Sequence, residues 1–198
     1  MMVTPGTSID CPFDGKFRAL AMKVALSPGV PADVRVAVDD VLISRLNTIT
    51  LGERLTLARR ASGRVAAALL LDVAGRDGKV GSVKIDDAKT EARNTRVMQT
   101  ALENPRLTEA LVIKSVLRPD AGAALVQAVA RHEKWSPRRE IRAALLRTEY
   151  LSLARALEFS HELPRPLLQE LLASSRLPAQ IKDQLLHKSG SNSPPQEN

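Results

Sequence analysis

The chain has 198 residues, of which 44% are hydrophobic and 26% are charged, and its formal net charge is +7 at pH 7. This length and composition predict one folded domain or one repeat array with a continuous core, and the charge allows, without requiring, a nucleic-acid or other anionic partner. A single cysteine, Cys11, excludes an internal disulfide framework and any metal or iron–sulfur site that needs several cysteines.

The amino-terminal region predicts a tail followed by paired helices. Residues 1–15 are rich in Pro, Gly and Ser and are expected to form a disordered tail. Residues 17–46 then show the order helix, turn, proline start and helix, in the stretches FRALAMKVALSPGV and PADVRVAVDDVLISRL. The next helix is predicted from Thr50, with Glu53 at the spacing of a capping box, and the strongly apolar stretch GRVAAALLLD (63–72) predicts another.

No segment has the pattern of a signal peptide or of a membrane span. The longest aliphatic run, from Val65 to Leu71, is too short to cross a bilayer. We therefore predict a cytoplasmic protein with no membrane partner.

An insertion is predicted at residues 73–95, between two helical stretches. Within it, the sequence GKVGSVKI places Val80 opposite Val83 across Gly81-Ser82, which is the chemistry of a tight two-residue hairpin. A two-stranded ribbon is marginally stable alone, so we expect either a small β-hairpin or a loop at about 76–86. A helix is predicted to begin after Asp86-Asp87.

Three apolar residues that precede predicted helix starts are spaced by 28 residues. They are Leu107, Trp135 and Leu163, and Leu177 follows half a period later. The next residues suit helix starts, because Ser and Thr side chains accept hydrogen bonds from free amides and Pro fits the first turn. These residues are Thr108, Ser136-Pro137, Pro164 and Pro178. The aligned position of Trp135 predicts a packing role in the core, with ligand stacking as the alternative.

The fold class follows from the length of the repeated unit. Each unit reads as two short helices, and a lone hairpin has too little apolar contact to offset an ordering cost of about 1.5 kcal/mol per residue. Stacking against neighbouring units supplies that contact. We predict an all-α fold, a right-handed α-solenoid of the HEAT/ARM kind with about eleven short helices, over residues 16–187. Residues 188–198 are predicted to form a disordered tail.

Four stretches together resemble a family of uncharacterised bacterial proteins that is similar to HEAT and leucine-rich-repeat-variant α-solenoids. They are LGERLTLARRASGRVAAALLLD, ALENPRLTEA, KWSPRREIRAALLR and SRLPAQIKDQLL, and the resemblance covers about residues 17–187. It implies a fold and no reaction. Some leucine-rich-repeat-variant proteins carry an amino-terminal cysteine cluster for iron and sulfur, and the lone Cys11 departs from that pattern.

The search for catalytic, cofactor and metal residues gives none. GRDGKVGS lacks the spacing of a phosphate-binding loop, and no serine stands in a G-x-S-x-G elbow. The pairs His132-Glu133 and His161-Glu162 are one residue out of phase with the repeat, so they point in different directions. A helical-repeat DNA glycosylase would need aromatic and acidic groups that converge, and no acid is paired with Trp135 or Tyr150. We predict that the protein is not an enzyme.

Two basic clusters are the strongest functional signal in the sequence. They cover residues 54–64 and 131–147, and the candidate macromolecule-binding residues are Arg54, Arg59, Arg60, Arg138, Arg139 and Arg142. We predict a non-catalytic scaffold that binds an unknown protein, because extended surfaces are what stacked helix pairs offer. The alternative is that both clusters bind duplex phosphates along one groove. A third interpretation is a solvated face whose arginine stems pack over the core.

Overall fold

The computed structural model describes residues 15–77 and 87–190 of the chain. These residues are all-helical, as predicted, with one short 3₁₀ turn and no strand in the described part of the chain. The α-helices are α1 (Gly15–Leu26), α2 (Ala32–Ser44), α3 (Leu51–Arg60), α4 (Gly63–Asp77), α5 (Asp87–Leu102), α6 (Glu109–Val116), α7 (Ala123–Arg131), α8 (Arg139–Leu145), α9 (Leu153–His161), α10 (Arg165–Ala173) and α11 (Ala179–Gly190).

The predicted boundaries differ from the observed ones around the insertion and at the carboxyl end. Within the predicted insertion 73–95, the described residues continue α4 as far as Asp77 and begin α5 at Asp87. The hairpin or loop expected at about 76–86 lies outside the described residues from 78 onward. The expected tails lie outside them at 1–14 and 191–198, and α11 extends to Gly190, beyond the predicted boundary at 187.

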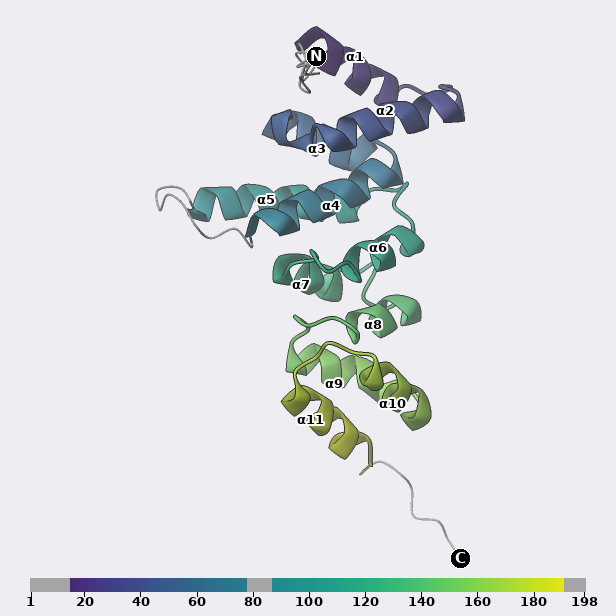
Figure 1. Ribbon diagram of the computed structural model, residues 1–198, viewed down its shortest axis with the longest axis vertical. Coiled ribbons are helices and arrows are strands. Elements are labelled where there is room, and N and C mark those ends of the chain that lie inside the picture. Colours follow the sequence, from purple (N-terminus) through teal and green to yellow (C-terminus); the bar gives the residue numbers. More distant parts are fainter. Residues whose placement is uncertain (1–14, 78–86, 191–198) are drawn as a thin grey trace, which may run out of the picture.

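The helices follow one another along the long axis of the molecule, from α1 at one end to α11 at the other (Figure 1). Each helix packs mainly on its neighbours in the chain or on helices close in sequence. One row of contacts joins α1, α3, α5 and α7, and a second joins α2, α4, α6 and α8. Helix α9 packs on α11, and α4 also reaches α7.

The apolar core runs through the stack without a break. One cluster of buried residues extends from Ala21 on α1 to Leu185 on α11. Leu, Ala and Val dominate it, and the two largest buried side chains are Trp135 and Phe159. Aliphatic side chains therefore fill most of the space between helices, which agrees with the low aromatic content of the sequence.

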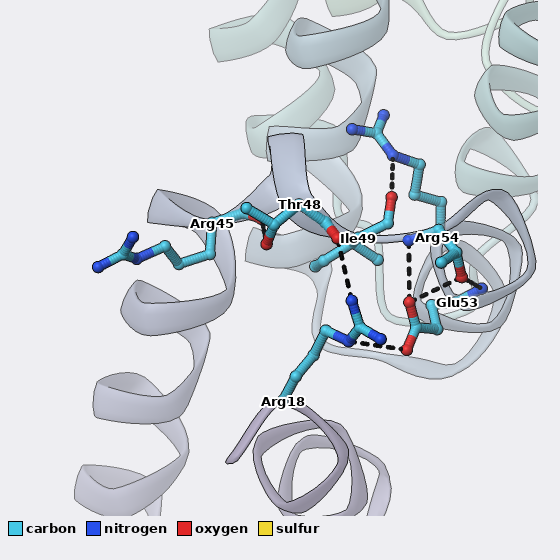
Figure 2. Close-up of polar contacts among 7 residues, drawn as sticks. Arg18, Arg45, Thr48, Ile49, Glu53 and Arg54 are labelled. Atoms are coloured by element: carbon cyan, nitrogen blue, oxygen red, sulfur yellow. Dashed lines mark hydrogen bonds and ion pairs between the residues drawn. The ribbon is translucent and has the colours of Figure 1, made fainter. Parts of the chain in front are cut away.

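The predicted capping box at the start of α3 is present (Figure 2). The Thr50 N–H donates to Glu53 Oε2 at 2.9 Å, and the Glu53 N–H donates to Thr50 Oγ1 at 3.5 Å. Burial alone would raise the pKa of Glu53, but the hydrogen bonds from Thr50 and the charge of Arg18 bring that pKa below its ordinary value. The ionised carboxylate thus stabilises the first turn of α3.

The predicted side-chain caps of α6 and α8 are wrong. Thr108 precedes α6, but its side chain makes no capping hydrogen bond. Helix α8 begins at Arg139, so Ser136 is not its cap. The reason at α8 is an additional turn after Trp135, in which the Arg138 N–H donates to the Trp135 carbonyl at 3.1 Å before the helix begins. Position in the sequence alone did not reveal this turn, because the dipeptide Ser136-Pro137 also suits a helix start.

The residues spaced by 28 make the same backbone turn. The N–H groups of Leu107, Trp135 and Leu163 each donate to the carbonyl three residues earlier, at 3.1 Å in all three cases. The acceptors are Asn104, His132 and Ser160. Ala121, half a period after Leu107, makes the same contact with Arg118 at 3.1 Å. These positions therefore share one kind of turn contact, which other helix ends in the chain also make.

Polar side chains tie two of these turns to the end of an earlier helix. The Trp135 Nε1–H donates to the Leu102 carbonyl at 2.8 Å, at the end of α5. Asn104 Nδ2 donates to the carbonyls of Ala58 and Ala61, at 2.7 and 3.2 Å, at the end of α3. The last carbonyls of a helix have no partner within it, so these donors satisfy groups whose burial would otherwise be costly.

Candidate functional site

Arg54, one of the six candidate arginines, is a structural residue in the interior. Only 6% of it is exposed. Its Nε–H donates to the Ile49 carbonyl at 3.2 Å (Figure 2), Nη2 donates to the Leu46 carbonyl at 2.5 Å, and Nη1 binds Asp72 Oδ2 at 2.6 Å. The guanidinium group holds the turn before α3 against α4 and is not available to a partner.

Two further candidates from the second cluster are engaged within the chain. Arg138 binds Glu109 at 2.6 Å and lies over the Trp135 ring, with 5.2 Å from its guanidinium carbon to the ring centroid. Arg142 donates from Nε to the Ser136 carbonyl at 2.7 Å and forms an ion pair with Glu162. These contacts fit the interpretation in which arginine stems pack over the core.

The remaining candidates, Arg59, Arg60 and Arg139, are exposed. The loop before α6 and the start of α6 link the two clusters, in part through a residue that the sequence analysis missed. Arg106 donates from Nη1 to the Arg60 carbonyl at 3.2 Å, and it lies in the loop before α6. Glu109, at the start of α6, binds Arg138. The backbone of the first cluster therefore contacts the loop before α6, and Arg138 of the second cluster contacts the start of α6. Four acidic residues, Glu103, Glu109, Glu133 and Glu140, stand close in sequence to these contacts.

A groove of about 1080 Å³ lies between α5 and α7. Its floor is apolar, with Met98 and Leu102 from α5 and Ala124 and Ala128 from α7. The members of each pair are four residues apart and so share one face of their helix. The two alanines are small, which leaves the space above them open.

Polar and charged residues surround this floor. The remaining residues that line the groove are Glu91, Thr95, Gln99, Glu103, Gln127, Arg131, His132, Glu133 and Lys134. Gln127 also donates from Nε2 to the carbonyl of Tyr150 at 2.6 Å. This hydrogen bond ties the loop at Tyr150, a residue that is 44% exposed, to α7.

His132 lies at the end of the groove where α7 ends. Its Nδ1 accepts a hydrogen bond from the Lys134 N–H at 3.1 Å, so the neutral ring carries its proton on Nε2. Burial lowers the pKa of His132 below its ordinary value, and the charge of Lys134 lowers it further, whereas Glu103 and Glu133 act in the opposite direction. Protonation at Nδ1 would also break the bond to Lys134.

We expect His132 to make the protein more sensitive to acid. Because its pKa is lower in the folded state, the unfolded chain binds more protons as the pH falls below about 6.5, so the free energy of unfolding decreases there. The variant His132→Asn keeps an acceptor for the Lys134 N–H, as Asn104 does for the Arg106 N–H at 2.8 Å, and has no charge to gain. The free energy of unfolding, measured with urea, should decrease less between pH 7.5 and pH 5.5 for the variant than for the wild type. Equal losses would contradict this role.

Other chemistry receives no support from the described residues. They contain no group of three or more His, Cys, Asp or Glu side chains placed to hold a metal ion. None of their helices is both long enough and apolar enough to span a bilayer. The candidate pairs His132-Glu133 and His161-Glu162 lie at the ends of α7 and α9.

Comparisons with known proteins give no relative from which a role could be transferred. No family model, no curated protein and no solved structure matches this chain.

Proposed function

We propose that the protein is a non-catalytic helical-repeat scaffold, a right-handed α-solenoid, which binds another protein in the groove between α5 and α7. The order of helix contacts supports the solenoid, because stacked repeats touch mainly their neighbours. The shared turn before Leu107, Trp135 and Leu163 supports it as well. Nearer the carboxyl end, the Arg176 N–H donates to the Arg147 carbonyl at 3.1 Å, and these two residues are about one repeat length apart in sequence.

The observation that carries the binding proposal is the apolar floor of the groove. Protein interfaces combine an apolar centre with a polar rim, and they favour aromatic residues and arginine. The groove has an apolar floor with Ala124 and Ala128 on its α7 side, and Arg131 lies on its rim. Met98 and Leu102 are already buried in the free chain, so the apolar surface that a partner would cover is that of Ala124 and Ala128.

Blocking the groove should abolish capture of the partner. The variant Ala128→Arg places a long charged side chain over the apolar floor, and Ala154→Arg is a matched control at an exposed position on α9. We expect affinity pull-downs from native lysate, treated with nuclease, to recover a protein with the wild type and with Ala154→Arg. Recovery with Ala128→Arg should fall at least tenfold. Equal recovery with both variants would contradict the proposal.

A second candidate function is binding of duplex nucleic acid through the exposed arginines. The contact between Arg106 and Arg60, together with the Glu109–Arg138 ion pair, supports it because both clusters contact α6 or the loop before it. Each phosphate neutralised adds about −0.9 to the slope of log affinity against log salt, so binding should weaken steeply between about 50 and 200 mM salt. A flat salt response, or no complex at low salt, would remove this candidate.

A further inference from the structure

We infer that the occupant of the α5–α7 groove is a short amphipathic helix whose apolar stripe has basic residues on one flank and acidic residues on the other. This inference rests on the proposed protein-binding function and specifies the chemistry of the partner segment. It follows from the size of the groove, the hydrogen-bonding state of its walls and the charges on them.

The size of the groove matches two to three helical turns. A helix about 10 Å wide that rises 1.5 Å per residue occupies roughly 120 Å³ per residue, so a volume of about 1080 Å³ corresponds to about nine residues. Helices pack with their axes 8–10 Å apart when small residues lie at the contact. Ala124 and Ala128 provide such a contact on the α7 side.

The walls favour a helix over an extended peptide. Both walls are α-helices, whose backbone groups are already bonded within the helix, so they offer no strand edge to which a peptide could add. An extended segment over Ala124 and Ala128 would bury N–H and C=O groups without partners, which is costly. A helix satisfies its own backbone groups and presents only side chains to the floor.

The two helical walls carry opposite charge. Among the residues that line the groove, the charged ones at the α5 wall are Glu91 and Glu103, and the charged one on α7 is Arg131. Glu133 and Lys134, in the loop after α7, have opposite signs and offset each other. Arg96 lines the adjoining hollow on α5 rather than the groove itself. A bound helix is therefore complementary when its flank toward α5 is basic and its flank toward α7 is acidic.

Three synthetic helices test this inference in either binding direction. All three are stapled peptides of about 14 residues with the same leucine stripe, and their flanks are Lys and Glu, Lys and Lys, or Glu and Glu. Reversing a helix in the groove exchanges its flanks, so the comparison depends on the charge set and not on direction. Fluorescence anisotropy with the full chain at low salt should show the Lys/Glu peptide binding roughly fivefold more tightly than either other peptide.

Charge reversal in the groove should change this preference in a defined way. With Arg131→Glu both walls are acidic, and the Lys/Lys peptide should become the tightest ligand. With Glu91→Lys and Glu103→Lys together, the Glu/Glu peptide should become the tightest. Arg165→Glu, at an exposed position on α10, is the matched control and should keep the wild-type order.

The outcomes separate this inference from the function on which it rests. Equal affinity for the three peptides, no binding of the Lys/Glu peptide, or an order unchanged by Arg131→Glu would overturn the inference. If the wild type still captures a lysate protein and Ala128→Arg does not, the scaffold function stands and its partner has another shape. If Ala128→Arg leaves capture unchanged as well, both proposals fail.

Discussion

Replacing Trp135 by alanine is expected to lower the free energy of unfolding by about 3–5 kcal/mol. The side chain is 1% exposed and belongs to the core cluster that runs through the stack. Truncation would leave a cavity and would also remove the donor to the Leu102 carbonyl. Urea unfolding followed by far-ultraviolet circular dichroism measures this loss without relying on tryptophan fluorescence.

A conservative variant separates the two contributions of Trp135. Trp135→Phe keeps most of the apolar volume but has no N–H for the Leu102 carbonyl, so we expect a loss of about 1–3 kcal/mol. The Lys134 ammonium, 4.4 Å from the ring centroid, would still lie over an aromatic face. A loss below about 1 kcal/mol for the alanine variant would show that Trp135 does not anchor the turn between α7 and α8.

Replacing Arg54 by methionine is expected to cost about 3–5 kcal/mol of unfolding free energy. Methionine preserves much of the apolar stem, but it leaves the partly buried Asp72 carboxylate without Arg54 and the Ile49 carbonyl without this donor. Breaking a buried ion pair by removing one partner is costly, because the other charge stays desolvated. Thermal and urea unfolding of the variant would measure the effect.

Arg59→Met is the matched control for Arg54→Met. Arg59 is on the same helix but is exposed, so its replacement should change stability by no more than about 0.5 kcal/mol. Similar losses for the two variants would contradict the structural role assigned to Arg54. This pair also decides which arginines of the first cluster remain available to a partner.

Much of the fold could be predicted from local signals in the sequence. The capping box at Thr50 and the helix starts after Leu107, Leu163 and Leu177 depend on short-range chemistry, which a single sequence displays. The buried position of Trp135 followed from its alignment with Leu107 and Leu163. The start of α8 was misjudged because a turn from Trp135 to Arg138 precedes it, and Ser136-Pro137 suits a turn as well as a helix start.

The candidate site could be predicted only in part, because it depends on distances between helices. Arg54 resembles its exposed neighbour Arg59 in sequence. It is distinguished in the structure by its contacts with the Leu46 and Ile49 carbonyls and with Asp72 of α4. The groove also depends on the distance between two helices, which the sequence does not give. Ala124 and Ala128 share a face at a spacing visible in the sequence, but the open space above them depends on how far α7 lies from α5.

Site-specific photo-cross-linking in native lysate tests the central claim most directly. In each of three variants a photoreactive residue would replace one side chain: Gln99 in the groove, the exposed Arg139 at the start of α8, or Glu170 on α10. We predict a protein adduct from position 99 that survives nuclease treatment, and none from the other two positions. An adduct that forms only from position 139 and disappears with nuclease would contradict a protein-binding groove and would favour nucleic-acid binding by the exposed arginines.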